Sequence, residues 1–505
     1  MADRSSGKGT WRTPLLALLL ALAAFVAWNF HSPREMSSSE PVSSTGPQVY
    51  FGPRKSIAVL PFELKDAPAE QAFWSVGFSV ELTRLLTLVS GLTVTSRNSA
   101  LYFKDRQATD RVIAERLQVN HLLFGALRIT GEKVHLDLRL FNALRDRDIW
   151  SQSLAVETGQ LFGIQASLIE GVTDAMRVGK AGQDLHIGSV KTEAWVSYLQ
   201  GLHHHEARTQ EGFLEAEKAF QAAIAIDPDY DLARLMLASN WLARSASGDP
   251  APMLLENARA ELQTVMRLNP DRPEALGISS YISRNYDWDW AAAVEAGEAA
   301  VRLSPGDPEL KTIASLALFS AGRFERARAL KEEAVQQDPL NLAGRLRLGL
   351  LQEFAGDYEA ALSSYRQLLG MNPDFPGARA FRARIKLIQQ KPESAMKEVD
   401  QEANAFWKRY SEILVLSASG RAEEANDPLE RLMVEDGPHA AYQVAEILAF
   451  RGDLDGAFRW LDKAYVQRDG GMKELLGNFF LNNLHGDPRW PELLSRMGLP
   501  LDLES

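Results

Sequence analysis

The feature that most constrains this chain is a set of five prolines that recur at a nearly constant spacing. Each ends a stretch of helical character, and successive prolines are 42, 35, 34 and 34 residues apart: Pro228, Pro270, Pro305, Pro339 and Pro373. Because proline cannot continue a helix, this spacing predicts a unit of two helices that is repeated along the chain. Such units stack into an elongated solenoid, and solenoids mostly bind other molecules rather than transform them.

A second set of positions keeps step with the prolines. Twelve residues before each proline lies an alanine, in the expected second helix, where a small side chain lets the paired helices approach closely: Ala216, Ala258, Ala293, Ala327 and Ala361. The period and the alanines together resemble the tetratricopeptide repeat, a two-helix unit of about 34 residues. The resemblance implies about eight repeats over residues 191–470, followed by capping helices over residues 471–505.

The first 54 residues divide into three segments by composition. Residues 1–12 are polar and basic, residues 13–30 contain a long run without charge, and residues 31–54 are rich in serine, proline and glycine. The uncharged run is just long enough to cross a bilayer, and its basic flank predicts that residues 1–12 stay in the cytoplasm. We therefore expect a single transmembrane helix followed by a flexible linker. A cleaved signal peptide and a buried soluble helix are the alternatives.

Residues 55–179 have the pattern of an α/β domain. The runs at 57–62 and 92–95 are typical of strands, while residues 70–89 have helical spacing. A second helix is expected to end at Leu117, with Thr109 as its cap.

Three strands and a closing helix follow in this domain. The middle strand alternates polar and apolar residues, which predicts one buried face and one solvated face: Val134, Leu136, Leu138 and Leu140 are the apolar positions. Short turns between the strands predict an antiparallel meander. With a last helix over residues 159–178, the domain is expected to be a β-α-β-α-β-β-β-α sandwich.

This order of elements, with the motifs SIAVLPF, FWSVGFSVELTRLL and LTVTSRNSA, resembles the TolB amino-terminal-like domain and the related FlgO-type domain. In bacterial proteins that domain often lies between an output module and tetratricopeptide repeats. The resemblance therefore implies a membrane-linked bacterial protein. One position departs from the family pattern: Val76 precedes Gly77 where members commonly carry an acidic residue.

Composition narrows the function classes. The net charge is −11, and an acidic chain lacks the dense basic surface that nucleic acid requires, so we expect no nucleic-acid partner. Without cysteine there is no disulfide framework, zinc-finger cluster or thiol nucleophile. Phosphate-binding loops, zinc-protease motifs and nucleophile elbows are also missing from the sequence. We predict a protein that is not an enzyme and has no catalytic residues, metal ligands or cofactor.

Three motifs have both a functional and a structural interpretation. His203–His205 are adjacent on a helix, so their side chains diverge, which favours a packed or solvated segment over a metal site. Asp287–Trp290 fits either a carbohydrate or cation site or an interhelix turn whose tryptophans pack between repeats. A basic cluster on one helix is either a solvated face or a surface for an acidic partner; it comprises Arg379, Arg382, Arg384 and Lys386.

The residues expected to face the inner surface of the solenoid form the candidate partner-binding set. In that position they could contact an extended segment of a protein partner. The set lacks the repeated lysine and asparagine pattern that chaperone-adaptor repeats use to hold a terminal carboxylate. It comprises Tyr281, Arg284, Asn285, Glu309, Thr312, Phe319, Glu353 and Arg384.

Two functions are consistent with these features. The first is a single-pass inner-membrane scaffold or adaptor, with its bulk in the periplasm, that binds other envelope proteins noncovalently. The alternative is a periplasmic sensor whose α/β domain binds a small ligand or a nucleotide and signals to a membrane partner.

Overall fold

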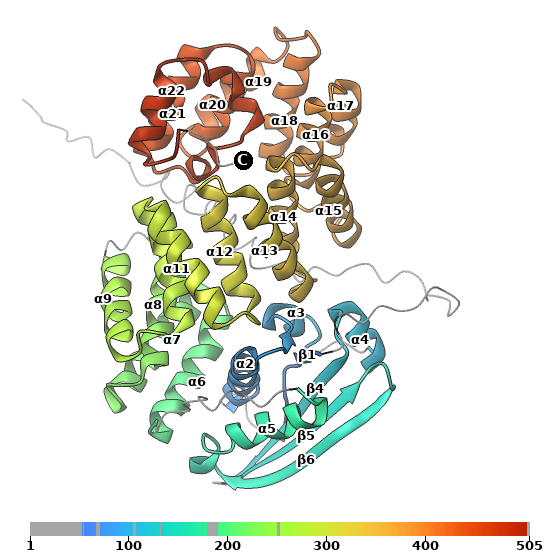
Figure 1. The fold of residues 1–505 in the computed structure, drawn as a ribbon, viewed down its shortest axis with the longest axis vertical. Coiled ribbons are helices and arrows are strands. Elements are labelled where there is room, and N and C mark those ends of the chain that lie inside the picture. The colour runs from blue at the N-terminus through green and yellow to red at the C-terminus, as the bar shows by residue number, and fades with distance from the viewer. Residues whose placement is uncertain are drawn as a thin grey trace, which may run out of the picture.

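A computed structural model describes Pro53 and residues 55–66, 71–104, 108–131, 133–178, 190–249 and 253–501. Figure 1 shows a sheet with a few helices at one end of the molecule and a curved array of helices that makes up the rest. Apart from Pro53, the expected tail, transmembrane helix and linker lie outside the described residues. Within the part of the chain that is described, none of the helices has both the length and the apolar character that crossing a bilayer requires.

The sheet has six strands and is mixed. β1 (Ser56–Val59) lies between β3 (Thr93–Val94) and β4 (His121–Thr130), and both are parallel to it. β4, β5 (Lys133–Asn142) and β6 (Arg147–Glu157) pair antiparallel, as the predicted meander requires. The predicted alternation along β5 is confirmed, because all four of its apolar positions are buried.

β2 (Glu63–Lys65) is a strand that the sequence analysis missed, and it also pairs with β4. Pro61 separates β2 from β1 and has no N–H to donate, so one continuous strand cannot form here. Phe62 lies between the two strands and packs over Gly125, where a Cβ would come within 2.5 Å of the phenyl ring. The expected buried strand therefore forms, but it ends at Val59, and Phe62 lies outside it.

Helices pack on both faces of the sheet. α2 (Phe73–Thr87) and α5 (Gln165–Met176) bury one face, and α3 (Arg97–Leu101) and α4 (Asp110–Leu117) cover part of the other. The Thr109 hydroxyl accepts a hydrogen bond from the N–H of Val112, which confirms the predicted cap of α4. The sheet region thus contains one strand and one short helix more than the expected sandwich.

Eight consecutive helix pairs follow within the described residues. They are α6 (Thr192–Glu206) with α7 (Gln210–Ile226), α8 (Asp231–Ala246) with α9 (Met253–Leu268), α10 (Pro273–Ile282) with α11 (Trp290–Leu303), α12 (Pro308–Ser320) with α13 (Phe324–Gln337), α14 (Leu342–Phe354) with α15 (Tyr358–Met371), α16 (Ala378–Ile388) with α17 (Pro392–Asp400), α18 (Ala405–Ala418) with α19 (Asn426–Arg431), and α20 (Ala441–Phe450) with α21 (Leu454–Val466). The first helices of these pairs form what we call the first-helix surface.

The periodic alanines and prolines that predicted the repeats have clear structural roles. All five alanines are fully buried, each in the second helix of its pair. Each of the five prolines lies two residues beyond the end of a second helix, where its missing N–H leaves no helical hydrogen bond unmade. Both observations agree with the predicted helix-pair unit.

The carboxyl-terminal region does not consist of capping helices alone. It contains two 3-10 turns, Gly470–Glu474 and Phe479–Leu484, and one helix, α22 (Arg489–Arg496). We call residues 470–484 the return segment, because they run from the end of the last pair back along the first-helix surface.

Candidate functional site

The sheet region covers the amino-terminal end of the first-helix surface, where α2 lies against α6 (Figure 1). Gly77 permits this approach, because a Cβ there would lie 2.8 Å from the Cβ of Leu199. Trp74 and Phe78 on α2 make edge contacts with Trp195 on α6, with ring centroids 5.9 and 6.1 Å apart. These residues belong to one buried cluster that extends from β1 to α10, so the sheet region and the first repeats share a core.

Polar contacts extend this boundary along the repeats. Arg84 on α2 reaches Glu274 on α10 at 3.5 Å. The hydroxyl of Ser99 on α3 donates to the Asp338 carboxylate, just before α14, at 2.6 Å. Contacts of the sheet region therefore extend from the first repeat to the start of the fifth.

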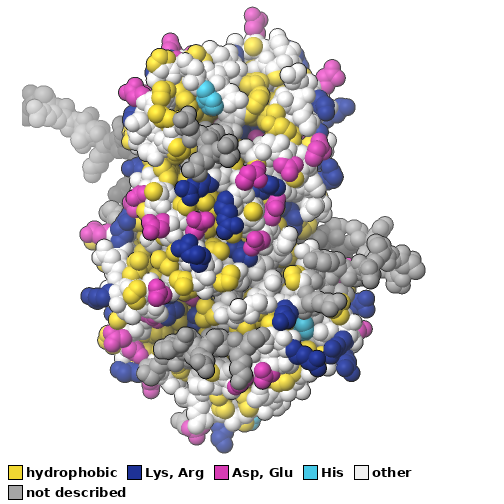
Figure 2. All heavy atoms as spheres, in the orientation of Figure 1, with side chains coloured by type: hydrophobic (Ala, Val, Ile, Leu, Met, Phe, Trp, Pro, Cys, Tyr) yellow, Lys and Arg dark blue, Asp and Glu magenta, His cyan; other side chains and the backbone are white. Residues whose placement is uncertain are grey.

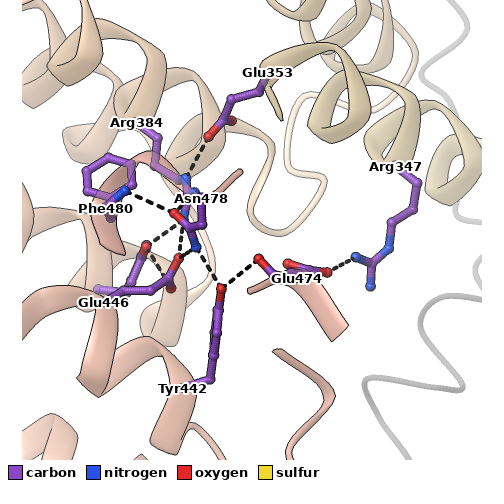
Figure 3. Close-up of polar contacts among 9 residues, drawn as sticks. Arg347, Glu353, Arg384, Tyr442, Glu446, Glu474, Asn478 and Phe480 are labelled. Atoms are coloured by element: carbon purple, nitrogen blue, oxygen red, sulfur yellow. Dashed lines mark hydrogen bonds and ion pairs between the residues drawn. The ribbon is translucent and has the colours of Figure 1, made fainter. Parts of the chain in front are cut away.

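The return segment covers the carboxyl-terminal end of the first-helix surface, and Arg384 on α16 is the centre of that contact (Figure 3). Its Nε donates to Glu353 at 3.1 Å, and its Nη1 donates to Glu446 at 2.9 Å and to the Tyr410 hydroxyl at 2.7 Å. Asn478 of the return segment donates to the same Glu446 carboxylate at 2.6 Å. One buried arginine thus joins carboxylates from α14 and α20.

Further contacts fix the start of the return segment. The Tyr442 hydroxyl donates to the backbone carbonyl of Glu474 at 2.9 Å and accepts from the Asn478 amide at 2.8 Å. Arg347 on α14 pairs with the Glu474 carboxylate at 2.6 Å (Figure 3). Residues more than a hundred positions apart in the chain therefore meet on this surface.

Burial controls the protonation of the Arg384 network. Burial raises the pKa of Glu353 and of Glu446, although Arg384 lowers both, and the net shift is upward. Burial lowers the pKa of Arg384, but Tyr410 and the two carboxylates raise it well above its usual value. The Oε2 atom of Glu353 is buried and has no hydrogen-bond partner among the described residues. Arg384 is therefore the cation that stabilises the charged forms of both carboxylates.

Apolar side chains hold the return segment against the first-helix surface. Six of its apolar side chains are buried: Met472, Leu475, Leu476, Phe480, Leu481 and Leu484. Burying a side chain of this size contributes about 1.5–3 kcal/mol, so the six contribute on the order of 10 kcal/mol. A partner of micromolar affinity gains only about 8 kcal/mol on binding. A partner that used the surface beneath the return segment would therefore have to displace these buried side chains first.

The two tryptophans of Asp287–Trp290 close the array on itself. Trp290 Nε1 donates to the backbone carbonyl of Met497, just beyond α22, at 2.6 Å. Trp288 stacks on Trp290 with centroids 6.3 Å apart, and the Arg468 guanidinium lies 4.2 Å from the Trp288 ring centroid. The geometry supports the interhelix-turn interpretation, and it joins the third repeat to the last helix.

Between the two covered ends lies a middle part of the first-helix surface. Of the eight candidate residues, four are accessible there: Glu309 is exposed, and Tyr281, Asn285 and Thr312 are partly exposed. The other four are buried: Arg284, Phe319, Glu353 and Arg384. The role of all eight residues in partner binding stays a prediction, but only the four accessible ones can meet a partner without rearrangement. We call these four, with Arg347 and Lys473, the middle surface.

The predicted basic cluster is divided by its surroundings. Arg379 and Arg382 pair with Glu398 at 3.7 and 2.8 Å, whereas Arg384 is buried in the network described above. Three of its four members are thus committed to intramolecular ion pairs.

The three adjacent histidines do not converge. His205 is buried, its Nδ1 lies 2.9 Å from Asn240 Oδ1, and burial lowers its pKa to about 4. In the described part of the chain, no group of three or more histidine, aspartate or glutamate residues is placed to hold a metal ion.

The solvated face of the sheet carries a depression of about 260 Å³ over β4, β5 and β6. Its polar lining comprises Lys65, Arg128, His135, Asp137 and Ser153. The sequence indicated the alternation that exposes these β5 side chains but not the depression, which depends on the neighbouring strands.

Comparison with known proteins agrees with the repeat architecture. The tetratricopeptide-repeat family model matches residues 286–342 and 346–408, from the turn before α11 to the start of α18. These helix pairs are tetratricopeptide repeats, in a mostly helical solenoid that carries a small mixed sheet.

One curated relative is a protein of Rhizobium meliloti (strain 1021) named "Putative adenylate cyclase 3", which is 24% identical over 204 residues. The match covers 39% of this chain and 34% of that protein, so the chain matches about a third of the relative's length.

Several solved structures align with part of this chain. PilF of Pseudomonas aeruginosa is 16% identical with a TM-score of 0.34, covering 44% of this chain and 98% of its own. PilW, a type IV pilus biogenesis factor, is 12% identical with a TM-score of 0.33, covering 50% and 98%. Yeast Tom70 is 15% identical with a TM-score of 0.36, covering 60% and 67%.

Proposed function

We propose that this chain is a scaffold that binds other proteins noncovalently through the middle surface. The observation that supports the proposal is the exposure pattern of the repeats: the chain itself covers both ends of the first-helix surface and leaves aromatic, amide and charged side chains accessible between them. Extended surfaces of this kind are what helical repeats use to hold protein segments.

Crosslinking in cells, followed by mass spectrometry, tests this proposal. Deleting the repeats is a poor test because they share a core with the sheet region. Instead, the double variant Glu309→Lys with Thr312→Glu changes two side chains of the middle surface and is expected to abolish capture of the partner. Lys218→Glu, on the second helix α7 and with a side chain 71% exposed, is the matched control and should leave capture unchanged. Equal capture by both variants would contradict the proposal.

We further propose that residues 13–30 anchor the chain in the inner membrane, with residues 1–12 in the cytoplasm and the folded part in the periplasm. The uncharged run and its basic flank support this placement. The partners would then be other envelope proteins. Alkaline phosphatase fused after residue 54 should be active, since that enzyme matures only outside the cytoplasm. Replacing the basic residues before the span with glutamate should reduce that activity.

A second candidate function is a sensor. We propose that the sheet region is a TolB amino-terminal-like domain whose depression of about 260 Å³ could hold a small anion or nucleotide between Lys65, Arg128 and His135. The name of the curated relative is the reason to include nucleotides among the ligands.

Thermal-shift screening of the full chain separates the sensor from the scaffold. A ligand of the sheet region raises the melting temperature in proportion to RT ln(1 + [L]/Kd). The shift should disappear in the Arg128→Ala variant, because Arg128 lines the depression. A screen without any shift, or a shift that survives Arg128→Ala, would argue against the sensor.

A further inference from the structure

The middle surface gathers positive charge around one amide oxygen. Arg284 Nη1 donates to Asn285 Oδ1 at 3.1 Å, and Lys473 Nζ donates to the same oxygen at 2.9 Å. An amide oxygen is neutral, so it accepts both hydrogen bonds without balancing either charge. Arg347 adds a third cation, with a side chain 42% exposed.

Few acids balance these cations. Among the described residues, the Glu474 carboxylate pairs with Arg347 at 2.6 Å, and its charge also acts on Arg284 and Lys473. The Asp469 carboxylate also acts on Lys473, but it accepts the backbone N–H groups of Gly471 and Tyr442. It is therefore committed to holding the start of the return segment.

A buried lysine adds to the same positive field. Lys331 on α13 is 2% exposed, and its ammonium donates to the Thr312 hydroxyl at 3.1 Å. Burial is the main cause that lowers its pKa to about 8; Arg347 lowers it further, while Asp338 opposes the shift. A hydroxyl, like an amide, leaves the positive charge unbalanced.

Burial, and after it repulsion among these cations, disfavours their charged forms. Burial and Arg347 lower the pKa of Arg284 to about 10. Burial, Arg284 and Arg347 lower the pKa of Lys473 to about 7, although Glu474 and Asp469 oppose the shift. A negative group placed beside such cations favours their charged forms and is attracted in return.

We propose that Lys473 and Arg347 bind the carboxylate of an acidic side chain in an extended segment of the protein partner, while the buried Arg284 adds to the positive field behind them. The carboxylate would replace Asn285 Oδ1 as the acceptor for Lys473. The inference rests on the proposed scaffold function and names the chemistry of the partner segment.

The chain already contains an example of this contact, since Arg347 binds the Glu474 carboxylate of the return segment. The partly exposed ring of Tyr281 next to these cations provides apolar area for the rest of an extended segment. Figure 2 shows Lys and Arg side chains together with Asp and Glu over the middle of this side of the molecule.

The test measures fluorescence anisotropy of a labelled polyglutamate peptide with the purified full-length chain. A polyglutamine peptide of equal length is the neutral control. We expect polyglutamate to bind and polyglutamine not to bind. The double variant Lys473→Gln with Arg347→Gln should weaken binding about ten-fold or more, as expected when charges at a binding surface are removed.

Matched controls separate a site from general attraction. Arg421→Gln and Lys218→Gln remove the same charge from side chains that are 53% and 71% exposed elsewhere on the repeats. They should bind polyglutamate like the unaltered chain. If the double variant melts at a lower temperature, the single variant Arg347→Gln replaces it, because that side chain lies at the rim of the site.

Three results would overturn the inference. One is no binding of polyglutamate, and a second is equal loss in the site and control variants. The third is binding of a phosphoserine peptide or inorganic phosphate at the same residues when polyglutamate does not bind, which would assign the site to phosphate.

Proton linkage gives a second readout. The charged groups that face Lys473 are Arg284, Arg347, Glu474 and Asp469. Because Lys473 loses its proton as the pH rises through about 7, affinity for polyglutamate should fall between pH 6 and pH 8.5, approximate limits chosen around that pKa. The fall should be smaller in Lys473→Gln.

The outcomes for the scaffold and for this site are distinguishable. If crosslinked capture of the partner persists in Lys473→Gln with Arg347→Gln but is lost in Glu309→Lys with Thr312→Glu, the scaffold proposal stands and the carboxylate site fails. If neither pair affects capture, both proposals fail.

Discussion

The two ends of the first-helix surface are covered by the chain in different ways. At the amino-terminal end, α2 meets α6 through aromatic rings and the missing side chain of Gly77. At the carboxyl-terminal end, the return segment meets α14, α16 and α20 around Arg384 and two buried carboxylates. The first contact depends on shape, and the second depends on one cation that two buried carboxylates share. A substitution at one end should therefore destabilise the fold by a different mechanism, and to a different extent, than a substitution at the other end.

The largest effect is expected for Arg384→Met. The change leaves Glu353 and Glu446 buried without their cation, and breaking a buried pair in this way costs about 3–5 kcal/mol. Urea unfolding measures the loss in the free energy of unfolding. Arg382→Met on the same helix is the control, with an expected loss of about 1 kcal/mol, since its side chain is 23% exposed. Equal losses in the two variants would mean that the buried Arg384 network contributes no more to the free energy of unfolding than the ion pair of Arg382 does.

The pH dependence of that variant identifies the cause of its instability. Both carboxylates have a raised pKa in the folded state, and removing Arg384 raises the pKa further. A raised folded pKa stabilises the fold while the group is protonated, and that stability is lost as the pH rises through it. Arg384→Met should therefore lose more stability at pH 8 than at pH 5, and adding Glu446→Gln should restore part of it. A loss independent of pH would point to packing instead.

A smaller effect, by a steric mechanism, is expected for Gly77→Val at the other end. The new side chain meets Leu199, and overpacking of this kind costs about 1–3 kcal/mol. Limited proteolysis should show earlier cleavage between the sheet region and α6. The control is Gly159→Ala, where no heavy atom lies within 4 Å of the added Cβ. Unchanged stability of Gly77→Val would disprove the tight approach of α2 to α6.

Trp290→Phe tests a contact that combines apolar packing with one hydrogen bond. The ring stays apolar, but the hydrogen bond from Nε1 to the Met497 carbonyl is lost. One such bond contributes about 1 kcal/mol. Differential scanning calorimetry should show a lower melting temperature, and hydrogen exchange should increase in α22. If hydrogen exchange in α22 does not change, the hydrogen bond from Trp290 to Met497 does not hold α22 in place.

The smallest effect is expected for Arg97→Gln, beside the apolar contact. Arg97 pairs with Glu206 at 2.5 Å, and the side chains are 24% and 13% exposed. A partly solvated pair of this kind contributes about 0.5–1 kcal/mol and is screened by salt. The difference from the unaltered chain should shrink at high ionic strength. A loss as large as that of Arg384→Met would show that charge pairing dominates at both ends.

Local features of the fold could be predicted from the sequence. The buried alanines, the prolines after second helices and the alternation along β5 each depend on a period that neighbouring residues display. Thr109 capped its helix as expected because a cap is also a local motif. Pro61 indicated where the first apolar run ends, but nothing local predicted that β2 resumes two residues later.

The candidate site was harder to predict because its contacts are distant in sequence. Arg347 and Glu474 are separated by 127 positions, and Arg384 and Asn478 by 94. Helical periodicity places Glu353 and Arg384 on the first helices but does not reveal that another segment covers them. A signal did exist: residues 472–484 are rich in apolar side chains without a helical period, which is typical of a segment that needs another surface to bury it.

The contact between Trp290 and the chain beyond α22 has a mechanical consequence. A linear array of repeats lengthens under tension through small rotations between neighbours, so its end-to-end distance is compliant. Here the third repeat and the last helix are joined directly, and repeats three to eight form a loop of fixed span. Under an applied force, that loop should extend little until the hydrogen bond from the Trp290 indole to the Met497 carbonyl breaks. Extension would then occur in one abrupt step instead of gradually.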